Sequence, residues 1–173
     1  QQSTGDVTYV PAPPNELVLG IDFGTSYSTA AVFVEGKVQY VLDAGDAAIP
    51  SLAYVPHAGP PVVGRDAIRL GYSDPFGLVS SVKRILGRAW GDPALRAIDA
   101  GASYSLAPAP NGGLVMKLNG HDLTPVQLVA AILQRLRKLA EQRFGRAPRR
   151  AVFTVPAEKP PGYPAALALA AKM

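Results

Sequence analysis

The segment that decides the fold is "LVLGIDFGTSYSTAAVFVEGKVQYV", residues 17–41. Residues 17–22 are nearly all apolar, as expected of a strand that is buried on both faces. A short Gly-Thr-Ser turn leads to a second apolar run at 28–34, and a Glu-Gly pair then reverses the chain into a third run at 37–43. Glycine adopts the positive φ that hairpin turns often need. The segment therefore predicts three consecutive antiparallel strands.

The composition favours a globular protein with no thiol or metal chemistry. The 173 residues are 48% hydrophobic and 17% charged, and there is no cysteine, which excludes disulfides and cysteine-ligated metals. The two histidines, His57 and His121, lie far apart in the sequence and in predicted turns, so we do not expect a zinc site. No apolar run approaches the roughly 20 residues of a membrane span. Residues 1–16 resemble a flexible, Pro-containing tail rather than a secretory signal, so a cytoplasmic location is expected.

The net charge of +4 raises the question of a nucleic-acid partner. Much of the positive charge lies between Arg135 and Arg150. These residues are not interleaved with aromatic side chains, and no groove-reading motif accompanies them. We therefore interpret them as the solvated face of a helix and the loop after it, and expect neither nucleic acid nor a membrane as partner.

Residues 43–120 are rich in Pro and Gly and predict short elements. A helix is expected over 64–72 and a short helical piece over 80–88. The stretch 114–122 is typical of a hairpin with Asn119-Gly120 as its turn. Short strands are expected at 51–55, 61–64, 104–107 and 113–118.

The C-terminal third predicts a helix, a strand and a second helix. Thr124 suits the N-cap, Pro125 the first helical position and Gly145 the C-terminal stop of a helix that carries an apolar stripe at helical spacing. The strand 149–156 ends at a proline, and residues 164–173 begin another helix that the sequence does not complete, which predicts a larger protein. Three antiparallel strands followed by helix, strand and helix is the ribonuclease-H-like order, which phosphate-binding ATPases use.

The turn after the first strand has the residue types of a phosphate site. Small residues let backbone amides approach an anion, and Thr25 and Ser26 add hydroxyl donors. Asp22 ends the strand, where it could hold a hydrated magnesium ion. An isolated Asp-Phe-Gly-Thr also fits a plain hairpin whose side chains bond to turn amides. A protein-kinase reading fails, because neither a Gly-rich loop nor an "HRD" catalytic loop precedes it.

Four segments, in order, resemble the seventy-kilodalton heat-shock chaperones of the DnaK type. "GIDFGTSYSTAAVFVEGKVQYVLDAGDAAIPS" (20–51) is similar to their first phosphate motif, which usually reads Gly-Ile-Asp-Leu-Gly-Thr-Thr-Tyr-Ser. "VKRILGR" (82–88), the helix 123–145 and "RRAVFTVPA" (149–157) resemble three further family segments. Actin-like proteins and sugar kinases share only the first motif. The resemblance covers about residues 18–157.

This resemblance implies an α/β fold of the actin-like ATPase type. A mixed ribonuclease-H-like sheet with flanking helices would comprise residues 17–42 and 121–173. A smaller α+β subdomain, residues 43–120, would be inserted between them. The family's second phosphate motif, its adenosine-binding segment and a catalytic carboxylate have no match in the sequence. We therefore expect one lobe of a two-lobed fold, which binds ATP poorly and hydrolyses it negligibly by itself.

The resemblance also implies roles for individual residues. Asp22 would lie near magnesium through water. Lys83 would reach the γ-phosphate and help to place the attacking water, although without the resemblance it reads as an exposed lysine. Contacts to the phosphates of ATP or ADP would come from Gly24, Thr25, Ser26 and Tyr27, the last mainly through its backbone.

The implied function is ATP hydrolysis in the full-length protein, which would drive binding and release of unfolded polypeptides with co-chaperones. Pro156 of the family's Val-Pro-Ala is kept, but the family's nearby arginine falls at Pro164, which indicates a divergent member. Two alternatives stay open: an actin-like filament protein, and a non-hydrolysing interaction module in which Asp22 and Lys83 are structural. An unpaired sheet edge also predicts self-association.

Overall fold

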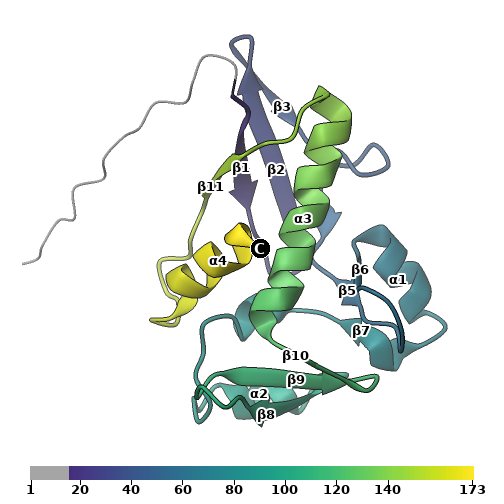
Figure 1. Ribbon diagram of the computed structural model, residues 1–173, viewed down its shortest axis with the longest axis vertical. Coiled ribbons are helices and arrows are strands. Elements are labelled where there is room, and N and C mark those ends of the chain that lie inside the picture. Colours follow the sequence, from purple (N-terminus) through teal and green to yellow (C-terminus); the bar gives the residue numbers. More distant parts are fainter. Residues whose placement is uncertain (1–15) are drawn as a thin grey trace, which may run out of the picture.

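A computed structural model describes residues 16–173 of the chain (Figure 1). The tail predicted for residues 1–16 thus lies outside the described residues except for Glu16. The main sheet has the strand order β11-β1-β2-β3, and β4 also pairs with β2. β1 and β2 are antiparallel, as are β2 and β3, whereas β11 is parallel to β1. The predicted three-strand meander is confirmed. The strands are β1 (Val18–Asp22), β2 (Tyr27–Val34), β3 (Lys37–Tyr40), β4 (Ile49–Pro50) and β11 (Arg150–Phe153).

Two helices, α3 (Pro125–Phe144) and α4 (Tyr163–Lys172), pack against each other and against the main sheet (Figure 1). The predicted ends of α3 are confirmed. The Thr124 hydroxyl accepts a hydrogen bond from the Gln127 amide while the Gln127 side chain bonds back to the Thr124 amide, which is a capping box. Gly145 ends the helix in the left-handed region, with φ 71°.

The segment between β4 and α3 forms two small three-stranded sheets with short helices (Figure 1). The predicted strands, the hairpin turn and the first helix are all present. The piece expected over 80–88 is reduced to one 3₁₀ turn, η2, at Val82–Arg84. The remaining elements are β5 (Ala53–Tyr54), β6 (Val62–Val63), α1 (Arg65–Gly71), η1 (Pro75–Gly77), β7 (Leu78–Val79), α2 (Leu95–Asp99), β8 (Ser105–Pro108), β9 (Leu114–Leu118) and β10 (His121–Leu123).

The expectation for the histidines needs a correction. His121 begins β10 instead of lying in a turn, and its Nε2 lies 3.0 Å from the carbonyl oxygen of Pro56 and 3.2 Å from that of His57. The two histidines are thus neighbours in space, because β10 packs beside the loop that follows β5. Among residues 16–173 no group of three His, Cys, Asp or Glu side chains could hold a metal.

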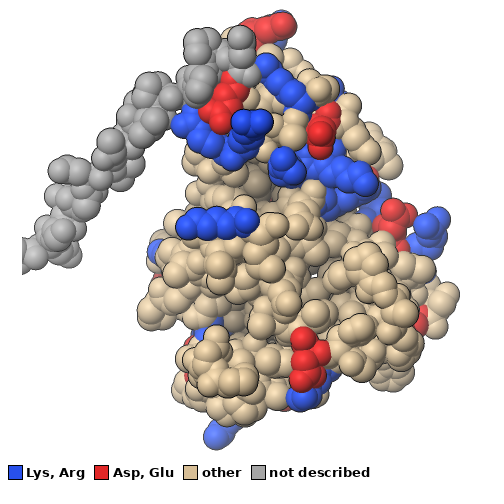
Figure 2. Space-filling view, viewed as in Figure 1, with Lys and Arg blue, Asp and Glu red and all other residues tan. Residues whose placement is uncertain are grey.

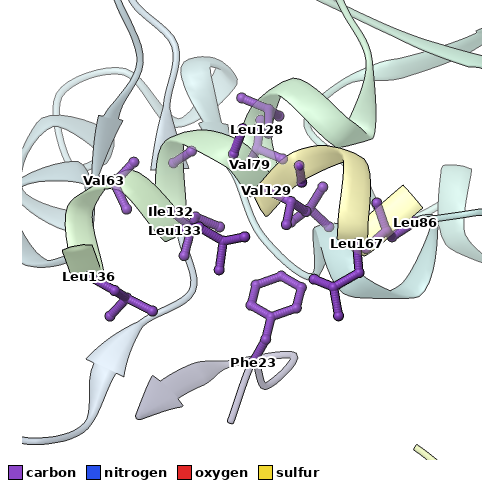
Figure 3. Close-up of a cluster of buried hydrophobic side chains, with 14 of the residues drawn as sticks. Phe23, Val63, Val79, Leu86, Leu128, Val129, Ile132, Leu133, Leu136 and Leu167 are labelled. Atoms are coloured by element: carbon purple, nitrogen blue, oxygen red, sulfur yellow. The ribbon is translucent and has the colours of Figure 1, made fainter. Parts of the chain in front are cut away.

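One hydrophobic core joins the main sheet to the segment 43–120. Figure 3 shows how side chains from α3 gather with Phe23, from the turn after β1, and with Leu86 and Leu167. Phe23 is completely buried. Because β4 lies within 43–120 yet pairs with β2, this segment contributes to the main sheet. The division into subdomains stays a prediction.

Basic side chains gather in the upper part of Figure 2, over the C-terminal half of α3 and β11. Several of them are engaged within the chain: Arg135 pairs with Asp43 at 2.8 Å, and the Arg137 side chain donates to the Pro148 carbonyl. Their interpretation as a helix face without a nucleic-acid partner stays a prediction. Across residues 16–173, the model contains no helix with the length and hydropathy of a membrane span.

Candidate functional site

The candidate site lies where the parallel strands β1 and β11 both end. Asp22 is the last residue of β1, and Thr154 follows β11 directly. The Thr154 hydroxyl donates to Oδ1 of Asp22 at 2.7 Å, and the Thr154 amide donates to the carbonyl of Ile21 at 3.1 Å. The carboxyl ends of parallel strands are where α/β sheets commonly bind ligands. Asp22 is exposed at this end, so its carboxylate is accessible.

The turn after Asp22 can be tight because Gly24 has no side chain. A Cβ at this position would lie 2.0 Å from the carbonyl oxygen of Tyr27, so any other residue would force the backbone apart. The far side of the turn is fixed by Ser51, whose amide donates to the Ser26 carbonyl at 2.9 Å. The hydroxyls of Ser51 and Ser28 are buried and lie 2.8 Å apart. Hydrogen bonds to Ser51 therefore hold the turn in place.

The outer side of this turn presents hydrogen-bond donors that the described part of the chain does not use. Thr25 and Ser26 are exposed, and neither hydroxyl bonds to another residue between 16 and 173. Within the same range, the amides of Gly24, Thr25 and Ser26 donate to no backbone carbonyl. Tyr27 has 59% of its surface exposed. Successive amides with two hydroxyls are suited to an anion, because they supply donors without moving.

Lys83 is brought to this turn from 60 residues away. Its Nζ donates to the carbonyl oxygen of Phe23 at 2.5 Å and lies 5.9 Å from the centre of the Phe23 ring. The segment that carries Lys83 is anchored by Val82, Ile85 and Leu86, whose side chains are fully or almost fully buried. An ammonium group thus stands beside the free donors of the turn. The resemblance to the chaperones predicted that Lys83 would lie at this turn. Neither the periodicity nor the spacing of the sequence indicated it.

These groups fit a phosphate that is accompanied by a hydrated divalent cation. The donors are two hydroxyls, backbone amides and an ammonium, which bind phosphate oxygens. The single exposed carboxylate of Asp22 matches magnesium, which keeps several waters and takes few protein ligands. The exposed positions of Thr25 and Ser26 leave their donors open to solvent, where a bulky anion would lie. Every residue that the sequence singled out for this site is therefore at one end of the main sheet.

The start of α4 is a part of this region that the sequence did not reveal. A Cβ on Gly87 would lie 2.3 Å from the amide nitrogen of Tyr163, and one on Gly162 would lie 2.5 Å from the Gly87 carbonyl. The two chain segments therefore touch backbone to backbone. Tyr163 is 1% exposed, and its hydroxyl has no hydrogen-bond partner among the described residues. The sequence shows only a tyrosine at the start of an Ala-rich helix. It does not indicate that this residue is buried against the Gly87 backbone.

One comparison with known proteins covers most of the chain. A family model described as "Hsp70 protein" matches residues 18–158, which is most of the 173 residues. The matched range contains the turn at 22–27, Lys83 and the strand β11.

Proposed function

The chain belongs to the Hsp70 family of chaperone ATPases, and we propose that residues 22–27 and Lys83 form a DnaK-type phosphate and magnesium site. The family has the actin-like ATPase fold, with which the mixed sheet and its helices agree, and its ATPases use nucleotide and magnesium. The observation that carries the proposal is the contact of Lys83 with the Phe23 carbonyl. It places a positive charge beside a turn whose amides and hydroxyls have no partner among residues 16–173.

Each residue then has a distinct task in binding Mg-ATP or Mg-ADP. Thr25, Ser26 and the neighbouring amides, that of Gly24 included, would donate to the β- and γ-phosphates, and the small size of Gly24 would allow the tight turn that presents them. Asp22 would hold waters of the magnesium ion. Lys83 would release the Phe23 carbonyl and turn to the γ-phosphate, where it would stabilise charge and orient the attacking water.

In the complete protein, hydrolysis at this site would drive cytoplasmic binding and release of unfolded polypeptides, with co-chaperones as partners. The 173 residues contain no second Gly-rich phosphate turn, so the proposed site is half of the nucleotide cleft. Residues 17–42 and 121–173 would form its base and 43–120 the inserted subdomain. By itself the chain should bind Mg-ATP weakly and hydrolyse it negligibly.

Titration calorimetry with Mg-ATP tests the proposal on this chain and on a longer form that includes the second phosphate motif. We expect measurable binding that is much tighter in the longer form, together with turnover in the longer form that Lys83→Ala abolishes. Lys117→Ala is the matched control, because Lys117 pairs with Asp122 on the β9–β10 hairpin, outside the site. Binding by neither form would contradict the proposal and favour a non-hydrolysing interaction module.

The edge of the main sheet supports a second, structural proposal. Among the described strands β11 pairs only with β1, and Val152 on it is 65% exposed. A hollow of ≈ 690 Å³ lies between α3, β11 and the end of α4. An open strand edge with an exposed apolar side chain favours pairing with a second copy. Sedimentation at increasing concentration should show association, which Val152→Lys should weaken; a sharp monomer at high concentration would contradict it. Assembly that depends on nucleotide would instead favour an actin-like filament.

A further inference from the structure

Asp22 has a threonine on either side of it in the main sheet. On the antiparallel strand β2, Thr29 lies opposite Asp22. On the other side, Thr154 follows Phe153 of the parallel strand β11, which lies opposite Ile21. Of these two threonines in the described structure, only Thr154 hydrogen-bonds to Asp22, through its hydroxyl to Oδ1 at 2.7 Å. The two neighbours of Asp22 therefore differ in one interaction, which makes the role of that interaction testable.

The backbone that carries the Thr154 hydroxyl is fixed on both sides. Its amide donates to the Ile21 carbonyl at 3.1 Å, which continues the β1–β11 ladder past the end of β11. Pro156 fixes its own φ and restricts Val155 before it, so the chain leaves the strand in a narrow range of conformations. The β-branched side chain of a threonine is also restricted at χ1. The Thr154 hydroxyl is therefore held in one place beside Asp22.

The Asp22 side chain has no other hydrogen bond or ion pair within residues 16–173. It is exposed, so without Thr154 it would turn freely among its rotamers. The Lys83 ammonium lies at the same turn but donates to the Phe23 carbonyl. Oδ1 of Asp22 is therefore used within the chain, whereas Oδ2 is available to a ligand.

We infer that Thr154 is a positioning residue of the candidate phosphate site, whose hydroxyl orients the Asp22 carboxylate for the waters of a magnesium ion. This inference rests on the proposed function. Holding an exposed aspartate in one rotamer before the ligand arrives removes an ordering cost that would otherwise oppose binding. Folding only exchanges water for Thr154 as the partner of Asp22, so the same bond contributes little to stability. Its effect is therefore expected in magnesium binding rather than in folding.

Two substitutions separate the hydroxyl of Thr154 from its shape. Thr154→Val keeps the β-branched side chain and loses the donor, whereas Thr154→Ser keeps the donor and loses the methyl group. Thr29→Val is the matched control, since it removes a threonine hydroxyl from the other side of Asp22, where the described structure has no bond to the carboxylate. For Thr154→Val we expect weaker binding of Mg-ATP at an almost unchanged urea midpoint. Thr154→Ser and Thr29→Val should both bind as the original chain does.

The experiment follows the amide NMR signals of residues 22–27 in the 173-residue chain, titrated with ATP at several magnesium concentrations. For Thr154→Val we expect a Kd for Mg-ATP about fivefold weaker, and binding of ATP without magnesium that is unchanged. Without any ligand, three-bond couplings that report χ1 of Asp22 should indicate one rotamer in the original chain and an average of rotamers in Thr154→Val. Thr154→Val should add nothing to Asp22→Ala, because the hydroxyl then has no carboxylate to orient.

The outcomes separate this inference from the proposed function. Equal Mg-ATP binding by Thr154→Val and the original chain, with Asp22→Ala impaired, would overturn the role of Thr154 and leave the phosphate site intact. The same would follow if Thr154→Ser bound as weakly as Thr154→Val, or if the loss were equally large without magnesium. A lower urea midpoint with unchanged magnesium dependence would assign Thr154 to the fold alone. Saturable shifts that neither Asp22→Ala nor Lys83→Ala affects, or no saturable shifts at all, would overturn the phosphate site, and the inference with it.

Discussion

Two short turns of this molecule both join antiparallel strands, yet they use their polar groups in opposite ways. In the turn at Asn119-Gly120, the polar side chain is hydrogen-bonded within the protein. The Asn119 amide group donates to the Val55 carbonyl at 2.9 Å and to Asp74 Oδ2 at 3.1 Å. Both of its residues have positive φ, as a two-residue hairpin requires. The turn after Asp22 instead leaves its amides and the Thr25 and Ser26 hydroxyls without partners among the described residues.

The difference separates a turn that holds structure from one that is available to a ligand. In the hairpin, the conformation comes from residues that tolerate positive φ, and the side chain ties the turn to its neighbours. In the turn after Asp22, the conformation comes from the close approach of Gly24 to the Tyr27 carbonyl, with no positive φ at Gly24. Free donors on a fixed backbone are what an anion site needs. Four substitutions test this contrast.

The largest effect is expected from Gly24→Ala. The added Cβ would meet backbone only 2.0 Å away, so the turn must open and β1 and β2 must shift. We expect the free energy of unfolding to fall by roughly 2–4 kcal/mol and Mg-ATP binding to be lost, measured by urea denaturation and calorimetry. Gly101→Ala is the control, since its Cβ would meet nothing within 4 Å. Similar losses for both variants would show that Gly24 has no special role.

A smaller loss, confined to stability, is expected from Asn119→Ala. The substitution leaves the Val55 carbonyl without its donor and places alanine at φ 46°, so the free energy of unfolding should fall by about 1–3 kcal/mol. Asn119→Gly keeps the positive φ but loses the same bonds, and separates the two causes. Mg-ATP binding should survive in both variants. If binding were lost as well, the contrast between the two turns would fail.

The network around Asn119 also predicts a pH dependence. Hydrogen bonds from Asn119 first, and then from Tyr54, lower the pKa of Asp74 below its ordinary value of 3.8. A lowered pKa contributes stability that is present above pH 3.8 and is lost as the pH falls toward the folded-state value. The urea midpoints of the original chain and of Asp74→Asn should therefore differ most near neutral pH and converge in acid. A difference that grows on acidification would have the wrong sign.

The smallest effect on stability is expected from Thr25→Val. Its side chain is exposed and its hydroxyl bonds to no described residue, so the free energy of unfolding should change by less than about 0.5 kcal/mol. Mg-ATP binding should nevertheless weaken about tenfold or more, because a donor to phosphate is lost. Thr29→Val, within β2, is the control and should bind normally. Unchanged binding by Thr25→Val would leave the hydroxyl without a function.

Regular periodicity made much of the fold predictable. The meander at 17–43, the capped helix ending at Gly145 and the hairpin at Asn119-Gly120 all carry signals that lie within a few residues of each other. β4 and β7, each two residues long, are too short to show a period, and they exist because neighbouring strands offer partners. The two histidines lie far apart in the sequence but are neighbours in the structure, because β10 packs beside the loop that follows β5.

The sequence by itself determined the turn chemistry at 22–27, the caps of α3 and, through four ordered segments, the family. Local residue types suffice for these features, because backbone preferences and capping act over three or four residues. Only the tertiary structure decided that Lys83 contacts Phe23 across 60 positions and that the start of α4 touches the backbone of Gly87. Such meetings depend on how β11 and α4 pack on β1, and burial of apolar surface between distant segments sets that packing.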